Sequence, residues 1–238
     1  MKHFLVFLSL LSTFSLSAQD WLIDGSSYKS TAQTTHDGKR LGLTNGLLRR
    51  TFLLAPNAAT IALDNLMTGQ NELRAVRPEA LLVINGKEYP VGGLTGQPVN
   101  NFLTEEFINN MQACDSAFML VDYQISESKE RFPWKRNSQW ISNLYPWPAP
   151  GKRITLNYQA PATAPQDCKD LKIRVIYELY DGAPILAKWI EIDNKGTMPV
   201  TLDSFKSEIL ALVETAPKVH YGEPHEVRMM AQEAGAYT

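Results

Sequence analysis

Residues 171–196 read "LKIRVIYELYDGAPILAKWIEIDNKG", and the alternation in this stretch restricts the chain to few folds. Every second residue from Leu171 to Leu179 is apolar or tyrosine, and most of the residues between them are charged. Because side chains of a β-strand point alternately to opposite faces, this period of two predicts a strand with one buried face. Asp181 and Gly182 follow directly and suit a hairpin turn, because both residue types tolerate a positive φ.

The return segment "ILAKWIEID" carries apolar residues on both faces. A strand of this kind is typical of a central position with a layer on each side, and we expect it there. "NKGTMP" then predicts another turn, and "VTLDSFKSEILALVE" predicts one or two further strands. Together these segments predict an antiparallel meander.

Earlier segments repeat the pattern of short strands and turns, and Asn85-Gly86 is a strong hairpin signal. Helical periodicity is rare. The one helix that we expect lies in "LTEEFINNMQ", where Thr104 can cap the N-terminus and two glutamates occupy the first turn. Many short strands joined by Gly, Pro and Asn turns predict an all-β fold, an antiparallel β-sandwich or supersandwich.

The N-terminus has the layout of an export signal. Lys2 and His3 precede an apolar run from Phe4 to Leu16, and small residues end at Ala18. We therefore expect residues 1–18 to be a signal peptide, residues 19–238 to form the mature domain, and the protein to be periplasmic or extracellular. The apolar run is shorter than the roughly 20 residues that span a bilayer, so we expect no retained membrane span.

Bulk composition limits the partners. The chain has 44% hydrophobic residues, enough for a real core, and a formal net charge of −2. Its isoelectric point is about 6.1. A broad basic surface that would neutralise nucleic-acid phosphates is therefore not expected, and nucleic acid and anionic membrane are disfavoured as partners.

The two cysteines, Cys114 and Cys168, leave two alternatives open. In an oxidising compartment they can form a disulfide, provided that their Cα atoms lie within roughly 4.4–6.8 Å, or they can be two free thiols. No Cys-x-x-Cys spacing occurs, and the chain has only four histidines. We expect no metal site and no cofactor.

The segment "ERFPWKRNSQWISNLYPWPAPGKR", residues 130–153, has neither regular period. It predicts a long ordered loop, here called the aromatic loop, and loops of this length are often functional. Its aromatic rings can stack on sugar faces while Arg131 bonds hydroxyl groups; alternatively, the rings only pin the loop to the sandwich. The carbohydrate-contact candidates are Trp134, Trp140, Tyr145, Trp147 and Arg131.

No catalytic residue is nominated. The stretch "HYGEPHE" holds His220 and His225, but its spacing matches no metal or catalytic motif, and a polar loop explains it better. Glu178 and Asp181 flank the predicted hairpin turn, where we expect them to be solvated. A glycosidase pair is defined by separation in space, which the spacing along the chain does not give.

The stretches "YELYDGAPILAKWIEIDNKG" and "RFPWKRNSQWISNLYPWPAPGKR" resemble the N-terminal domain of secreted bacterial α-galactosidase-like proteins, glycoside hydrolase family 36 of the melibiase type. The resemblance covers most of residues 40–215. It implies a β-supersandwich of galactose-mutarotase-like architecture that precedes a (β/α)8 catalytic barrel. The family's catalytic aspartates lie in that barrel, so the resemblance assigns no catalytic role to any residue here.

The resemblance further implies a domain that packs on the barrel, helps to shape the substrate entrance, and in some relatives forms homo-oligomer contacts. The chain stops without a closing strand that we recognise, and we expect it to be the front part of a longer retaining glycosidase that acts on galactosides or plant oligosaccharides. Two alternatives stay open: a free-standing carbohydrate-binding module and a sugar mutarotase. A mutarotase needs histidine and glutamate at the sugar ring, and the mature chain offers only His36, His220 and His225.

Overall fold

The computed structural model describes residues 20–98, 102–135, 137, 139 and 146–213. The expected signal peptide, two carbohydrate-contact candidates, Trp140 and Tyr145, and the segment with His220 and His225 lie outside the described residues.

One layer of the fold contains a five-stranded sheet with the order β1-β2-β3-β4-β5. All its neighbouring strands run antiparallel, and a bulge separates the pairings of Thr51 and Phe52 in β3. The strands are β1 Thr31–Thr34, β2 Arg40–Thr44, β3 Leu48–Leu53, β4 Ala59–Asn65 and β5 Gln70–Asn71.

The opposite layer is a four-stranded antiparallel sheet with the order β11-β12-β13-β14. Its strands are β11 Met119–Glu127, β12 Gly151–Gln159, β13 Leu171–Tyr180 and β14 Leu186–Asn194. The predicted hairpin is confirmed, because Leu171 pairs with Asn194 and Leu179 with Leu186. The expected central position of the return strand is wrong: β14 lies at the edge of this sheet.

The remaining strands form smaller sheets. A three-stranded sheet has the order β15-β7-β8, with β15 Leu202–Lys206, β7 Ala80–Ile84 and β8 Lys87–Val91. Two-stranded ladders join β9 Leu94–Thr95 to β10 Gln112–Ala113, and β6 Leu73–Ala75 to β16 Ala211–Leu212. The Asn85-Gly86 turn between β7 and β8 is confirmed, with φ angles of 49° and 73°.

The expected helix is confirmed as α1, Glu105–Asn110. The Thr104 hydroxyl caps it by accepting a hydrogen bond from the Phe107 amide at 3.3 Å, and Glu105 and Glu106 occupy the first turn. Negative side chains at this end interact favourably with the unpaired amides of a helix N-terminus. The buried Ile108 anchors α1 in a small apolar cluster with Leu53, Ile61 and Met111.

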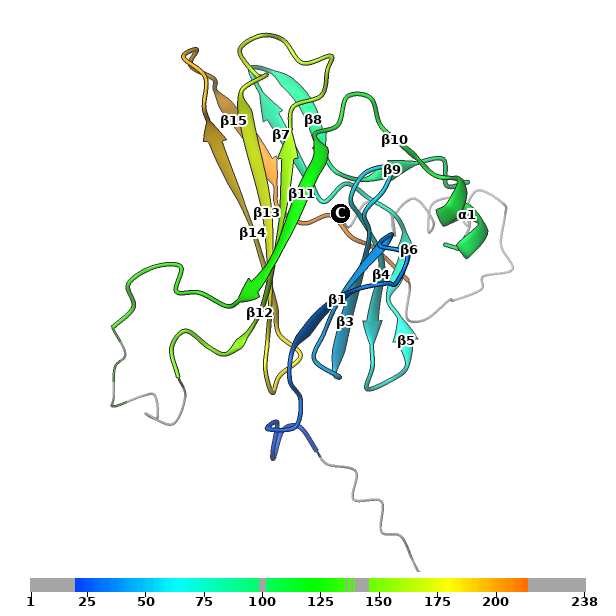
Figure 1. The fold of residues 1–238 in the computed structure, drawn as a ribbon, viewed down its shortest axis with the longest axis vertical. Coiled ribbons are helices and arrows are strands. Elements are labelled where there is room, and N and C mark those ends of the chain that lie inside the picture. The colour runs from blue at the N-terminus through cyan, green and yellow to red at the C-terminus, as the bar shows by residue number, and fades with distance from the viewer. Residues whose placement is uncertain (1–19, 99–101, 136, 138, 140–145, 214–238) are drawn as a thin grey trace, which may run out of the picture.

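The main core lies between the layers. In Figure 1 the long strands β12, β13 and β14 run along one side, and the five-stranded sheet lies across from them. A single apolar cluster contains side chains from all three sheets, among them Leu41, Phe52, Leu82, Val91, Ile154, Leu156, Ile173 and Val175. All pairings between named strands are antiparallel in the described part of the chain. The predicted all-β sandwich is confirmed.

Ionised side chains are enclosed beside this core. Arg50 from β3 and Lys188 from β14 both bond Glu208, at 2.7 Å and 2.8 Å. Glu79, which precedes β7, accepts hydrogen bonds from Arg50, Tyr177 and Thr60. Since an unpaired buried charge is costly, these mutual contacts are what allows Arg50, Glu79 and Lys188 to lie inside the sandwich, while Glu208 stays partly exposed.

The two cysteines are free thiols, one of the two alternatives left open by the sequence. Cys168 is buried, and the half-buried Cys114 has its sulfur 3.1 Å from the Ser116 hydroxyl. No helix among the described residues has the length and apolar character needed to cross a bilayer.

Candidate functional site

The aromatic loop leaves the four-stranded sheet between β11 and β12. Strand β12 begins at Gly151, so the segment outside the strands is residues 128–150. Ser128 fixes both ends of the loop: its amide donates to the Gly151 carbonyl at 2.9 Å, and its hydroxyl donates to the Ala149 carbonyl at 2.5 Å. Figure 1 shows the described parts of the loop, residues 128–135 and 146–150, extending away from the two layers at the end of the sheet where the β13–β14 hairpin turns.

Three rings gather within this loop and form what is called here the aromatic cluster: Phe132, Trp134 and Trp147. The ring centroids of Trp134 and Trp147 lie 4.9 Å apart at an interplanar angle of 62°, and those of Phe132 and Trp147 lie 5.9 Å apart. Edge-to-face contacts of this kind favour a fixed arrangement of aromatic rings. Phe132 keeps 52% and Trp134 36% of its surface exposed, so the cluster presents apolar ring surface to solvent.

Glu130 holds the cluster from one side. Its carboxylate accepts a hydrogen bond from the Trp147 indole nitrogen at 3.1 Å and a longer one from the Trp134 backbone amide at 3.4 Å. One carboxylate therefore holds the Trp147 indole and the backbone at Trp134. Two residues far apart in the loop sequence are brought together by this single side chain.

Arg131 connects the loop to the outer face of the sheet. Its guanidinium carbon lies 4.6 Å from the centroid of the Trp189 ring in β14, and its Nη2 lies 3.4 Å from the Tyr180 hydroxyl. The guanidinium of Arg153 approaches the same ring at 5.2 Å. Cations over an aromatic face are attracted by the electron density of the ring, so Trp189 acts as the anchor of the loop.

Glu178 lies buried where the aromatic loop joins the outer face of the sheet, here called the junction, and is only 1% exposed. Arg153 bonds it through Nε at 2.7 Å, the Tyr180 hydroxyl donates to it at 2.9 Å, and the Lys129 amide donates at 3.1 Å. Burial, followed by the hydrogen bond to Glu178, raises the pKa of Tyr180, which therefore remains a protonated donor at neutral pH.

The expected solvation of Glu178 and Asp181 is wrong. Glu178 belongs to the outward face of β13, but the loop covers that end of the sheet and Arg153 compensates its charge. The Asp181 carboxylate bonds the amide and hydroxyl of Ser30 at 2.8 Å and 2.7 Å and lies 3.3 Å from the Lys29 amine. Both carboxylates tie distant segments to the hairpin.

The structure brings together two of the five carbohydrate-contact candidates, Trp134 and Trp147, which share one cluster, while Arg131 of the same loop lies over Trp189. Four further residues of the junction were missed by the sequence analysis: Glu130, Arg153, Tyr180 and Trp189. A signal for Trp189 existed, because a tryptophan opposite the core face of a strand needs its own partner.

The arrangement is suited to binding and has little that would serve acid–base chemistry. Glu130 and Glu178 already accept hydrogen bonds from the groups they hold, and Glu191 binds the Trp189 indole at 3.2 Å and Arg174 at 2.7 Å. In the described part of the chain, no three His, Cys, Asp or Glu side chains are grouped so that they could hold a metal ion.

Comparison of the chain with protein-family models, with curated proteins and with solved structures finds no match. The fold and the geometry of the aromatic loop therefore stand on the chain's own residues.

Proposed function

We propose that this chain is the non-catalytic, carbohydrate-contacting N-terminal domain of a secreted glycoside hydrolase of the α-galactosidase type. The observation that carries the carbohydrate part is the aromatic cluster, with its exposed ring surface at the end of the four-stranded sheet. The hydrolase part is supported by the sequence resemblance described above and agrees with the all-β architecture.

The chemistry of the cluster matches that of a sugar ring. A pyranose has an apolar face of C–H groups and a rim of hydroxyls, so it combines with a flat aromatic surface bordered by hydrogen-bonding groups. Phe132 and Trp134 offer the exposed apolar surface. Arg131 and the exposed Lys135 are donors in the same segment, and both can reach hydroxyl groups.

The fixed geometry of the aromatic loop is the second observation that supports carbohydrate binding. A loop that had to order itself on binding would lose affinity through the entropy of its side chains. Here Glu130 holds the Trp147 indole and the backbone at Trp134, and Arg131 anchors the loop on Trp189. A sugar that contacts the cluster therefore meets groups that are already in place.

Calorimetry tests the carbohydrate part. The mature chain is titrated with galactose, with the α-galactoside raffinose and with cellotriose as a plant-type oligosaccharide. We expect binding of at least one of them, weakened about three- to tenfold by Trp134→Ala and by Trp147→Ala, because each truncation removes roughly 1 kcal/mol of ring contact.

Phe205→Ala is the matched control. Phe205 in β15 is 60% exposed, like the rings of the cluster, but it belongs to the three-stranded sheet. Affinity should be unchanged in this variant. If all three variants bind every saccharide as the unmodified chain does, the rings only pin the loop and the carbohydrate role fails.

The hydrolase part has its own test, which is to read the coding sequence beyond the codon for Thr238. We expect an open frame whose product alternates strands and helices as a (β/α)8 barrel does. A stop codon combined with saccharide binding would instead favour the free-standing carbohydrate-binding module.

A further inference from the structure

A second concave surface lies on the outer face of the five-stranded sheet, away from the aromatic loop. It is a groove of about 550 Å³, bordered by β1 to β5 and by the start of α1. Pockets that bind small molecules have volumes of roughly 300–1,000 Å³, so the groove has the size of a ligand site. At its α1 end the groove is lined by Ile61 and Ile108, which also belong to the small apolar cluster under that helix.

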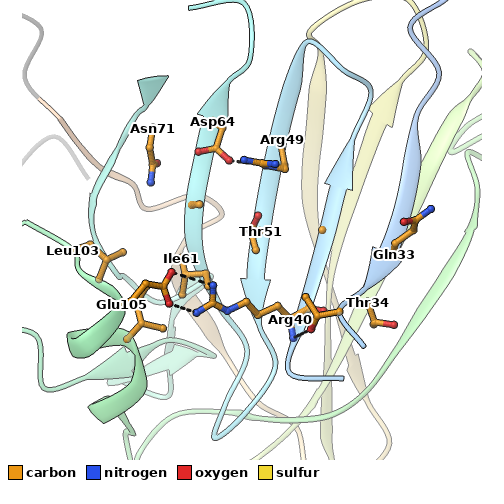
Figure 2. Close-up of a pocket in the computed structure, with 14 residues that line it drawn as sticks. Gln33, Thr34, Arg40, Arg49, Thr51, Ile61, Asp64, Asn71, Leu103 and Glu105 are labelled. Carbon is orange, nitrogen blue, oxygen red and sulfur yellow. Dashed lines mark hydrogen bonds and ion pairs between the residues drawn. The ribbon is translucent and has the colours of Figure 1, made fainter. Parts of the chain in front are cut away.

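Two ion pairs border the groove, as Figure 2 shows, with Thr51 between them. At one end both terminal nitrogens of Arg40 bond the two carboxylate oxygens of Glu105, one of them at 3.1 Å. At the other end Arg49 Nε bonds Asp64 at 2.7 Å. Each pair fixes an arginine fork and a carboxylate side by side, so donors and acceptors lie next to each other at both ends.

The floor of the groove contains a glycine that the fold itself does not require. Gly42 stands in the middle of β2, between Gln33 of β1 and Thr51 of β3. A Cβ added there would meet only the Gln33 carbonyl oxygen, at an ordinary 3.8 Å, and its φ is not positive. By contrast, Gly151 in β12 is needed, since a Cβ there would lie 2.5 Å from the Leu179 carbonyl.

A glycine inside a strand weakens the strand, and it often marks a place where a ligand or another backbone approaches closely. With Gly42, Thr51 and Ala62 as neighbours across the strands, the floor is free of large side chains. The two arginines rise on either side of it. The groove is therefore hollow because small residues lie side by side on three strands, and it is not a gap between secondary-structure elements.

Several polar groups along the groove have unused hydrogen-bonding capacity. In the described part of the chain, no hydrogen bond engages the Thr51 hydroxyl or the Gln33 side-chain amide. The Asn71 side-chain oxygen already accepts from the amides of Leu63 and Leu73, at 3.2 Å and 3.0 Å. This leaves the Asn71 amide nitrogen as the donor that it can offer to a ligand.

The charge balance selects the class of ligand. Two arginines and two carboxylates border the groove. An anion would therefore be repelled by Asp64 and Glu105, and a cation would be repelled by Arg40 and Arg49. A neutral compound with many hydroxyl groups can use both members of each pair, because a hydroxyl donates and accepts. Leu103 and Ile61 add apolar surface on one side, which suits the C–H face of a sugar ring.

We propose that this groove binds a short neutral saccharide through Arg40, Arg49, Thr51 and Asn71. The site lies on a different sheet from the aromatic loop and stands on its own residues, so it goes beyond the function proposed above. A domain with both sites contacts carbohydrate at two separate surfaces.

The test follows the backbone amides of the mature chain by two-dimensional nuclear magnetic resonance during titration with raffinose or cellotriose. We expect at least one of them to shift the amide signals of Gly42, Thr51 and Ala62. Gly42→Val should abolish these shifts, because its two methyl groups fill the floor while the strand accepts a β-branched residue readily. Arg49→Met should weaken binding in the groove about tenfold.

Arg174→Met is the matched control. Arg174 and Glu191 form a cross-strand pair with an Nε to oxygen distance of 2.7 Å, as Arg49 and Asp64 do, but on the other sheet. Groove binding should be unchanged in this variant. The spread of signals in each spectrum verifies folding, and Arg49→Met remains a valid test if Gly42→Val does not fold.

Three outcomes would overturn the site: no saccharide shifts the groove amides, the shifts persist unchanged in the folded Gly42→Val or Arg49→Met variant, or only an acidic sugar such as galacturonate produces them. The two proposals also separate in this experiment. Trp134→Ala should leave the groove shifts intact even where it abolishes binding at the aromatic loop.

Discussion

Arg50 and Glu79 form an ion pair inside the sandwich, with Arg50 Nη2 3.3 Å from a Glu79 oxygen and with side chains that are 2% and 1% exposed. The Arg50 guanidinium also lies 4.6 Å from the centroid of the Tyr177 ring. The pair joins β3 of one layer to the segment before β7, and Lys188 and Glu208 complete it with a second positive and a second negative charge. This buried network couples the two layers electrostatically.

Removing one member of the network should be costly. Arg50→Met leaves Glu79 buried without its nearest charged partner, and we expect the free energy of unfolding to fall by about 3–5 kcal/mol. The neighbouring Arg49 is 49% exposed and pairs with Asp64 at the surface, so Arg49→Met should cost less than about 1 kcal/mol. Urea unfolding of both variants measures the difference, and equal losses would show that the network adds nothing to stability.

Acid should weaken the fold through Glu208. Burial alone would raise the pKa of this carboxyl, but attraction from Arg50 and Lys188 outweighs burial and lowers the pKa from 4.5 to about 2. A pKa that is lowered by folding stabilises the native state above the unfolded value, and this stability is lost as the pH falls through the folded value. We therefore expect a loss of roughly 1–2 kcal/mol between pH 4.5 and pH 2, after allowance for the partial exposure of Glu208.

Glu208→Gln isolates this contribution. The variant should be less stable at neutral pH and should change less between pH 4.5 and pH 2. Glu106→Gln, at an exposed position in α1, controls for the loss of one surface carboxylate. If Glu208→Gln retains the full acid dependence of the unmodified chain, another group is responsible.

Loss of the hydroxyl group should affect the stability of the fold differently at two buried tyrosines, Tyr158 and Tyr177. The Tyr158 hydroxyl is buried and has no hydrogen-bond partner among the described residues, so Tyr158→Phe should be neutral or stabilise the fold by up to about 1 kcal/mol. The Tyr177 hydroxyl donates to Glu79, so Tyr177→Phe should cost about 1–3 kcal/mol. Denaturant midpoints at one pH compare them, and a clear loss in Tyr158→Phe would reveal a partner for its hydroxyl.

Thiol chemistry tests the state of the cysteines. The chain, unfolded without reductant, should show two reactive thiols for a thiol reagent. In the folded chain Cys168 should react slowly, because burial and the adjacent Asp167 raise the pKa of its thiol, while the half-buried Cys114 should react faster. Absence of free thiol on unfolding would mean that the two cysteines are joined.

Local signals in the sequence were sufficient for much of the fold. The alternation in residues 171–180, the Asn85-Gly86 turn and the Thr104 cap depend on neighbours along the chain, and the structure confirms all three. The position of β14 does not depend on neighbours alone. Its second apolar face is explained by the contact of Trp189 with the loop, which a sequence pattern cannot distinguish from a covering layer.

Long-range pairing explains what the sequence analysis missed. Arg50 shares the inward face of β3 with Phe52, and Lys188 shares that of β14 with Ile190, so each interrupts an apolar pattern. That interruption signals a buried charge but does not name the partner, since Glu79 lies 29 residues from Arg50 and Glu208 lies 158 residues away. The groove is likewise assembled from several strands and α1.

The aromatic loop was found from composition, while its organisation came from contacts. Tryptophans, prolines and basic residues in an aperiodic segment were enough to nominate Trp134, Trp147 and Arg131. That Glu130 holds the Trp147 indole and the backbone at Trp134, and that Arg131 covers Trp189 on the sheet, depends on the path of the chain. Arg131 is therefore an anchor of the loop as well as a candidate donor to sugar hydroxyls.

Contact between the aromatic loop and carbohydrate can be measured by recording the indole N–H signals of the chain's five tryptophans while raffinose or cellotriose is added. We expect the Trp134 signal to move until the site is saturated and the Trp189 signal, from the ring covered by Arg131 and Arg153, to move less. Substitution of each tryptophan by phenylalanine assigns the signals. If no saccharide moves the Trp134 or Trp147 signal, the aromatic loop does not contact carbohydrate and the proposed function is contradicted.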